Sequence, residues 1–273
     1  MWPFHVGMGP LAISPVELFA FLGVAITASL ARKRMAPAPG VSWIWLVDLG
    51  LAATVGGAVG SRLFYFIPHW ITGLERGGSL VSAWSEGAGF WGALFGGMTG
   101  LALMARWKKL PFLPVWDAVA AKMPFGFTSG KLGCFLAGCC YGPRCDGALG
   151  ISFVPGSLAY QTQRAAGLIP AGAPRALPVH PTQVYEVVLV LALFGMLAWV
   201  QRRSRRPGET TLAWFSGYAV TRFVVEFFRD DPGRHGFGSS LLSDSQITSI
   251  VVVAASGVFW SLLRRREPAA SPS

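Results

Sequence analysis

The chain has 273 residues, of which 52% are hydrophobic and only 13% are charged. Soluble proteins carry roughly 25% charged residues. This composition, with a mean hydropathy of +0.48, therefore excludes a disordered chain, a coiled coil and an ordinary cytosolic enzyme. The net charge of +10 would suit nucleic-acid binding. However, the positive residues cluster between apolar runs, as in the loops of membrane proteins, so we expect a membrane protein that binds no nucleic acid.

Seven apolar segments approach the length of about 20 residues that a helix needs to cross a bilayer. They are residues 13–31, 43–67, 88–105, 113–141, 182–200, 211–228 and 247–263. The pattern predicts an all-α, polytopic protein with about seven transmembrane helices in a single membrane domain over residues 1–273. The first segment lacks the basic start and cleavage site of a signal peptide, so we expect it to stay. In the fourth we expect a bend or break near Pro124 and Gly130.

Clusters of Lys and Arg follow the first, third, fifth and seventh segments, whereas the alternate connections hold fewer. These clusters lie at residues 32–34, 106–109, 202–206 and 264–266. Because such clusters mark cytoplasmic loops, we expect the N-terminus on the outer side of the membrane and the C-terminus in the cytoplasm. The longest connection, residues 142–180, is then an outer loop, and a loop of this length is usually functional or disordered.

Several charged residues fall inside the apolar segments, where an unpaired charge costs about 2.5–3.5 kcal/mol. On the predicted orientation, five separate segments bring side chains to the outer side of the membrane, and this convergence points to a functional site. The side chains are Arg62, Trp91, Lys131, His180, Gln183, Tyr185, Glu186, Arg222 and Glu226, with the cysteines beside them. Asp48, Asp117 and Lys122 lie nearer the cytoplasmic side, where we expect structural pairing.

The outer groups allow a structural and a functional interpretation. Arg222 and Glu226 stand at i and i+4 and share a helix face. Either they neutralise each other, or Arg222 binds a phosphate while Glu226 orients it or acts as a base. Lys131, flanked by glycines, and Arg62 either bind a lipid phosphate or extend to the headgroup level. His180, directly before a helix start, is a candidate ligand contact.

All four cysteines lie within one short stretch: Cys134, Cys139, Cys140 and Cys145. Their spacing is not that of a zinc ribbon or a CxxC motif, so we expect no metal, although zinc held by three of them is geometrically conceivable. A disulfide from Cys145 to Cys139 or Cys140 is one alternative on an oxidising outer side. Buried apolar thiols and a thiol site activated by a nearby cation are the others.

Three stretches carry a family resemblance. Residues 180–186 read His-Pro-Thr-Gln-Val-Tyr-Glu, residues 222–229 read Arg-Phe-Val-Val-Glu-Phe-Phe-Arg, and residues 60–63 read Gly-Ser-Arg-Leu. They resemble the His-Pro-(Ser/Thr)-Gln-Leu-Tyr-Glu, Arg-Phe-x-x-Glu-Phe-Phe-Arg and Gly-Ala-Arg-Leu stretches of the bacterial prolipoprotein diacylglyceryl transferase family. That family also has seven spans with the N-terminus outside.

The family moves diacylglycerol from phosphatidylglycerol to the lipobox cysteine of a preprolipoprotein and releases glycerol phosphate. The resemblance implies such a lipid transferase in a bacterial inner membrane, with the 142–180 loop and the active region on the periplasmic side. We expect phosphatidylglycerol as the substrate and no cofactor. Catalytic functions are implied for Arg222, Glu226 and His180, and headgroup binding for Lys131, Arg62, Arg222 and Tyr185.

The chain departs from the family at several site positions. Where the family reads Gly-Arg-(Ile/Leu)-Gly-Asn-Phe-x-Asn-Gly-Glu, Lys131 replaces the Arg, Cys134 and Ala137 replace the Asn residues, and Cys139 replaces the Glu. Lysine keeps the charge but loses bidentate phosphate binding. Trp91 occupies the place of a family His and cannot act as a base. Two alternatives therefore stay open: a divergent relative that uses cysteine chemistry, and a non-catalytic lipid-binding membrane protein.

Overall fold

The computed structural model describes residues 15–35, 43–74, 90–230 and 242–265. The helices are α1 (Pro15–Met35), α2 (Trp43–Leu74), α4 (Phe90–Trp107), α5 (Phe112–Ala120), α6 (Met123–Ala137), α7 (Leu158–Ala165), α8 (Thr182–Arg203), α9 (Glu209–Glu226) and α10 (Asp244–Arg265). The described ranges contain no strand, only isolated bridges that join Val179 to Arg144 and Ile151. The predicted all-α class is therefore confirmed.

The helices follow the apolar segments closely. Each expected segment coincides with one helix, except that the fourth is divided between α5 and α6. The first two residues of the segments expected at 13–31 and 88–105 lie outside the described residues. By length and composition, α1, α8 and α10 are each able to cross a membrane. The structure thus supports a membrane protein, whereas the count of seven crossings stays a prediction.

The fourth segment, residues 113–141, is broken near Pro124, as the sequence predicted. The chain leaves the helical path at residues 121–122, directly before Pro124, which occupies the first turn of α6. Proline lacks a backbone N–H, and the first turn of a helix tolerates it best because the N–H there has no partner within the helix. Gly130 causes no break. Instead, α6 ends at Gly138, whose φ of 65° forms a left-handed cap.

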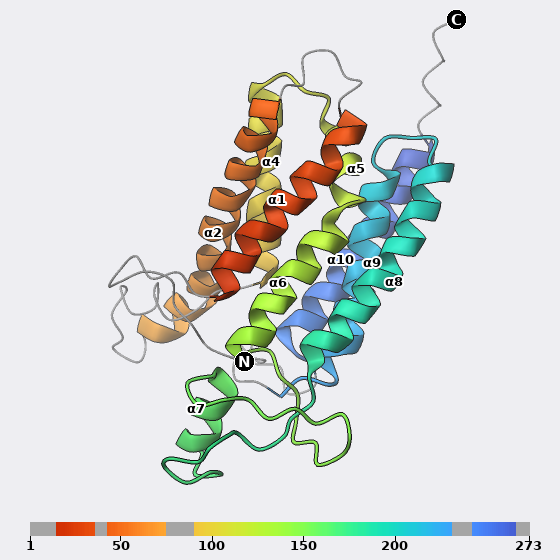
Figure 1. Cartoon of the computed structure of the whole chain (residues 1–273). Coiled ribbons are helices and arrows are strands. Elements are labelled where there is room, and N and C mark those ends of the chain that lie inside the picture. The colour runs from red at the N-terminus through yellow and green to blue at the C-terminus, as the bar shows by residue number, and fades with distance from the viewer. Residues whose placement is uncertain (1–14, 36–42, 75–89, 231–241, 266–273) are drawn as a thin grey trace, which may run out of the picture.

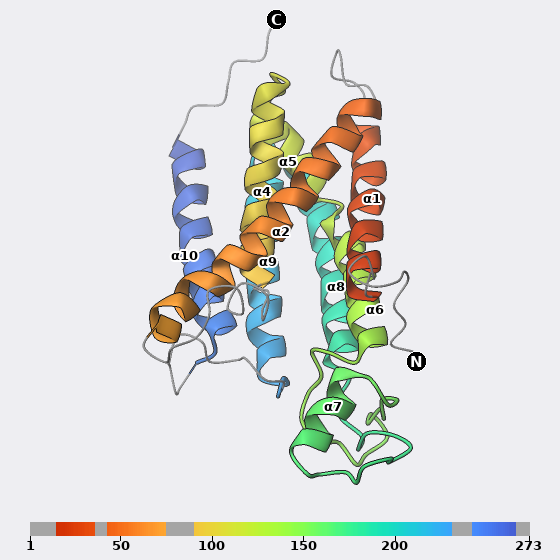
Figure 2. The same cartoon turned by 90° about the vertical axis from the view of Figure 1, so that its left-hand side faces the viewer.

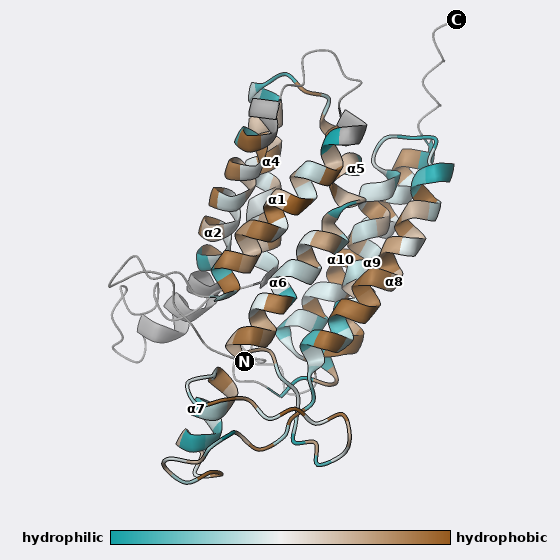
Figure 3. Cartoon of the chain, in the orientation of Figure 1, coloured by the Kyte–Doolittle hydropathy of each residue, from teal (hydrophilic) through white to brown (hydrophobic). Residues whose placement is uncertain are grey.

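The long helices form one bundle, with α6 between two groups (Figure 1). Helices α1 and α8 both pack against α6, α2 packs against α4, and α9 packs against α8 and α10. Hydrophobic residues predominate along the helices, and hydrophilic residues gather toward the bundle ends (Figure 3). Large apolar side chains such as Leu51, Leu103 and Val188 are more than half exposed, at 62%, 65% and 61%. Exposed apolar surface of this extent suits contact with lipid.

Glycines hold α2 against α4. A Cβ atom added to Gly96 of α4 would lie 2.2 Å from the carbonyl oxygen of Gly56, and one added to Gly60 of α2 would lie 2.3 Å from that of Gly92. Because no side chain fits there, the two backbones meet directly, as in small-xxx-small packing of membrane helices. The contact fixes α4, and with it Trp91, relative to α2.

The charges expected near the cytoplasmic side are structural, as predicted for Asp48 and Asp117. Lys108 Nζ lies 2.6 Å from Asp48 Oδ2. Asp117 accepts hydrogen bonds from the backbone N–H of Gly208 at 2.7 Å and of Thr211 at 2.9 Å, so it caps the start of α9. Lys122 forms a cation–π contact instead.

The Lys122 ammonium lies 5.6 Å from the ring centre of Phe194.

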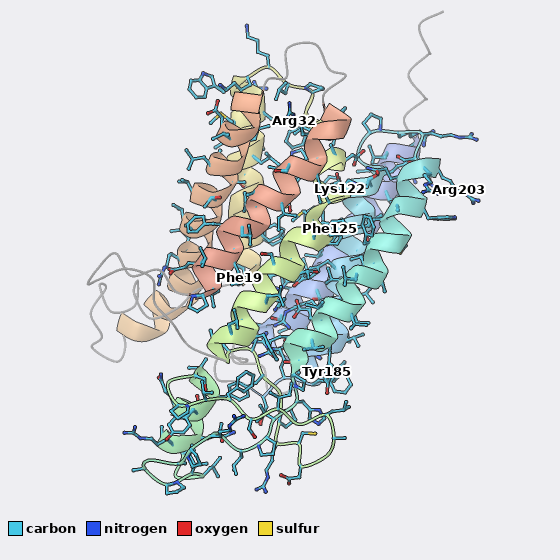
Figure 4. All side chains as sticks on the ribbon, viewed as in Figure 1. Phe19, Arg32, Lys122, Phe125, Tyr185 and Arg203 are labelled. Carbon is cyan, nitrogen blue, oxygen red and sulfur yellow. The ribbon has the colours of Figure 1, made fainter. Side chains whose placement is uncertain are left out.

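Figure 4 shows Arg32 and Arg203 at one end of the bundle and Tyr185 toward the other. The bundle therefore has a basic end, and the start of α8 lies at the opposite end.

Residues 142–180 fold into an ordered lobe beyond the end of the bundle where α8 begins (Figure 2). Phe153 and Tyr160 contribute to a small apolar core within it. The Gln163 side chain donates to the Leu177 carbonyl at 3.2 Å and accepts from its N–H at 2.7 Å. Of the two expectations for this loop, functional or disordered, the disordered one is wrong.

Candidate active site

Glu186 joins three helices. It lies one residue after Tyr185, which Figure 4 labels toward the end of the bundle where Figure 1 shows α7. Its Oε2 atom lies 2.8 Å from Lys131 Nζ of α6, and its Oε1 atom accepts a hydrogen bond from the Tyr218 hydroxyl of α9 at 2.8 Å. The side chains of Lys131 and Glu186 are only 12% and 2% exposed. Such a buried ion pair is strongly destabilised when one partner is removed, so these three residues hold α6, α8 and α9 in register.

A second ion pair lies one helical turn further along α9. Arg222 Nη2 is 2.6 Å from Glu226 Oε2, and both side chains are almost fully buried, at 3% and 2% exposed. Arg229 Nη1 lies 3.6 Å from the same carboxylate oxygen. Arg222 Nη2 also donates to Ser245 Oγ of α10 at 3.0 Å. The pairing at i and i+4 expected from the sequence is thus confirmed, and it holds the Arg222 guanidinium in a fixed position.

Together these residues form a compact polar centre, which we define as Lys131, Glu186, Tyr218, Arg222, Glu226 and Arg229. Arg222 lies within electrostatic range of both Lys131 and Glu186. Three cations face two carboxylates, so the centre carries a net positive charge when all are ionised.

The Nη1 atom of Arg222 is buried and has no hydrogen-bond partner among the residues that the structure describes. A buried donor without a partner is costly, because the guanidinium has five donors to satisfy. An anionic oxygen would satisfy this donor and neutralise the excess charge, since arginine forms strong charge-assisted bonds with phosphate.

His180 and Tyr185 form a separate polar contact at the start of α8. His180 Nδ1 lies 2.9 Å from Tyr185 Oη, and both side chains are partly buried. The backbone N–H of Gly142 donates to the His180 carbonyl at 2.8 Å, which ties this pair to the lobe. Their functions in headgroup binding and catalysis stay predictions.

Two further predicted site residues lie on the neighbouring helices, Trp91 on α4 and Arg62 on α2. The Trp91 ring is 2% exposed and meets the Tyr218 ring edge-to-face, with centroids 6.1 Å apart. The position expected to correspond to a family histidine is therefore filled by an apolar ring in contact with the polar centre. Arg62 is partly buried on α2, and its function in binding a headgroup also stays a prediction.

The end of α6 brings three cysteines together. The Sγ atoms of Cys134, Cys139 and Cys140 all lie within 4.8 Å of one another. All four cysteines are free thiols, so the disulfide from Cys145 to Cys139 or Cys140, considered from the sequence, is absent. The Cys139 thiol donates to the Cys134 carbonyl at 3.6 Å, and Lys131 lies within electrostatic range of Cys134 and Cys140.

The sequence pattern alone did not single out Tyr218, Arg229 or the pairing of Glu186 with Lys131. Tyr218 precedes Arg222 by four residues, so helical spacing places it on the same face. Arg229 belongs to the quoted 222–229 stretch. The partner of Lys131 comes from another helix, and spacing within one helix carries no signal for such a contact.

An all-helical membrane protein with a buried, net-positive centre at one end of its bundle suits a reaction on an anionic lipid. The chain belongs to the prolipoprotein diacylglyceryl transferase family, whose model matches residues 3–262. Phosphatidylglycerol–prolipoprotein diacylglyceryl transferase 2 of Clostridium perfringens is 30% identical over 88% of this chain and 87% of its own length. The phosphatidylglycerol–prolipoprotein diacylglyceryl transferases of Bordetella bronchiseptica and Paracidovorax citrulli are 32% and 30% identical over 94% and 98% of this chain. The alignments span 94% of the Bordetella bronchiseptica protein and 97% of the Paracidovorax citrulli protein.

These comparisons confirm the family inferred from the three sequence stretches. They identify the chain as a transferase enzyme of this family and so favour catalysis over lipid binding alone. They leave the functions of individual residues as proposals.

Proposed function

We propose that the protein transfers the diacylglyceryl group of phosphatidylglycerol to the cysteine thiol of a lipoprotein precursor. The observation that carries the proposal is the buried Arg222 guanidinium, whose Nη1 atom lacks a partner among the described residues and which lies in a net-positive centre. The related enzymes are named for this donor lipid and for prolipoprotein, which supports the same substrates here.

In the proposed reaction the acceptor sulfur attacks the carbon of the diacylglyceryl group that is joined through oxygen to the phosphate. A carbon–sulfur bond forms, the carbon–oxygen bond breaks, and the electron pair leaves with glycerol phosphate. Negative charge on the phosphate increases as that bond breaks, and cations fixed in a buried site stabilise it without reorganisation. Arg222 and Lys131 supply this field, while Arg62, Tyr185 and His180 contact the headgroup.

The two carboxylates have different partners. Glu186 is shared by Lys131 and Tyr218, so its function is to position Lys131. Glu226 forms an ion pair with Arg222. We assign Glu226 the orientation of the guanidinium and assistance in removing the acceptor proton. Trp91 supplies no base in this reaction.

We also propose seven membrane crossings, with the N-terminus in the periplasm and the C-terminus in the cytoplasm of a bacterium. In support, Arg32 and Arg203 lie at one end of the bundle, and Tyr185 lies toward the other (Figure 4). The positive-inside rule assigns the basic end to the cytoplasm. In this proposal the polar centre and the lobe of residues 142–180 lie on the periplasmic side of the inner membrane.

The test is complementation of a bacterium depleted of its own diacylglyceryl transferase, with growth and thioether-lipidated lipoprotein measured by mass spectrometry. Wild type should rescue growth and Arg222→Ala should not. Arg144→Ala is the matched control, because the Arg144 side chain is 62% exposed and pairs only with exposed Asp146 among the described residues. Failure of the membrane-inserted wild type to rescue, or full rescue by Arg222→Ala, would contradict the proposal.

A further inference from the structure

The cysteine cluster is built by an unusual backbone path. Gly138 and Cys140 both have left-handed conformations, with φ of 65° and 59°. A positive φ is rare for a residue other than glycine. Between them, the Cys139 N–H donates back to the Cys134 carbonyl at 3.1 Å. The chain therefore folds back at the end of α6 and places three sulfurs on one side.

Helix α8 holds this reversal in place. Gln183 Nε2 donates to the Cys139 carbonyl at 2.6 Å, and the Thr182 hydroxyl donates to the Cys140 carbonyl. The Gln183 and Thr182 side chains are each 1% exposed. The positions of the sulfurs are thus set by buried contacts from a second helix, as expected of a preorganised binding site.

The donor set suits one class of ligand. Thiolates are soft ligands that select zinc and similar thiophilic cations. With zinc–sulfur bonds of about 2.3 Å, sulfurs in a tetrahedral site lie about 3.8 Å apart. The three Sγ atoms are within 4.8 Å of one another, so side-chain rotations of about 1 Å or less at each sulfur close the site. Cys145 is not a member of this group.

The surrounding charge favours a divalent cation. Three thiolates and one divalent cation carry a single negative charge. Lys131 lies within electrostatic range of Cys134 and Cys140, and Arg229 lies within range of Cys140. The nearby Lys131 and Arg229 cations stabilise that negative charge. A monovalent cation would leave two negative charges on the cluster.

We propose that Cys134, Cys139 and Cys140 bind one thiophilic divalent cation of the zinc class beside the polar centre. The expectation of no metal rested on sequence spacing. Spacing carries no information on the left-handed conformations of Gly138 and Cys140, which bring the sulfurs together. Three protein ligands leave the fourth tetrahedral position for water or for a further thiolate. The metal site does not depend on the proposed transferase function.

The test uses the full-length protein in detergent, reduced and freed of metal by chelation, and then loaded with Zn²⁺ or Co²⁺. We expect one ion per chain by elemental analysis and a sulfur-to-cobalt charge-transfer band. Zn²⁺ should also protect Cys134, Cys139 and Cys140, but not Cys145, from alkylation mapped by peptide mass spectrometry. These measurements on wild type do not depend on the folding of any variant.

Ser substitutions provide the matched comparison. Cys139→Ser should weaken Co²⁺ binding by more than about 10-fold, whereas Cys145→Ser should leave it unchanged. Arg222→Ala should keep the metal even though it loses transfer, so failure of the metal proposal and failure of the transferase proposal are distinguishable. Three reduced thiols that retain no ion, equal binding by Cys139→Ser, or a disulfide within the cluster would overturn the proposal.

Discussion

The ion pair between Lys131 and Glu186 should couple the stabilities of α6 and α8. Its charged atoms are 2.8 Å apart and the Glu186 side chain is 2% exposed. At an effective dielectric constant of about 20, the attraction at this distance is about 6 kcal/mol before desolvation is subtracted. Removal of one partner of a buried pair typically costs about 3–5 kcal/mol, because the other charge is left without its counterion.

We therefore expect Glu186→Gln to lower the free energy of unfolding by about 3 kcal/mol, the lower end of that range, because the amide oxygen still accepts from Tyr218. Lys131→Gln should have a similar effect. The double variant removes both charges, so it should be more stable than the sum of the single effects predicts, by about 1–3 kcal/mol. Reversible unfolding in mixed micelles, followed by circular dichroism, measures all four proteins. Additive losses within about 0.5 kcal/mol would refute the reasoning.

Two other structural contacts give sharp predictions. Gly96→Ala should destabilise the protein by about 1–3 kcal/mol, since its Cβ atom would lie 2.2 Å from the Gly56 carbonyl oxygen. The control Gly195→Ala has open space around it and should be neutral or stabilising by up to about 1 kcal/mol. Thermal unfolding compares the two, and equal destabilisation would contradict direct α2–α4 contact. Asp117→Ala should lower the free energy of unfolding by about 1–2 kcal/mol, because the cap of α9 is lost. Lipid binding should not change. Loss of lipid binding would show that Asp117 is not merely structural.

The end of the bundle that carries the candidate site was predicted from the sequence. Apolar length defined the segments, and the distribution of Lys and Arg predicted which end of each segment faces which side. Helical spacing then placed Arg222 and Glu226 on one face. Because charges inside a membrane are rare, the few present identified Lys131 and Arg222 as candidates.

The contacts between helices were not predictable. Which residue of α8 meets Lys131 depends on the rotation and tilt of two helices, and these are set by packing such as the glycine contact of α2 with α4. The cysteine cluster depends on two backbone dihedral angles. A left-handed Cys140 has no sequence signature, so the spacing of Cys134, Cys139 and Cys140 did not indicate that their sulfurs converge.

The central claim is that Arg222 and its surrounding charges stabilise the leaving phosphate during transfer of a diacylglyceryl group to a thiol. The most direct measurement uses the purified protein in nanodiscs that contain phosphatidylglycerol, with a lipobox peptide that carries one cysteine. Release of glycerol phosphate and formation of the thioether peptide should be equal in wild type. Both rates should fall by about 100-fold or more in Arg222→Ala. No product from the folded wild type, or an unchanged rate in Arg222→Ala, would contradict the account.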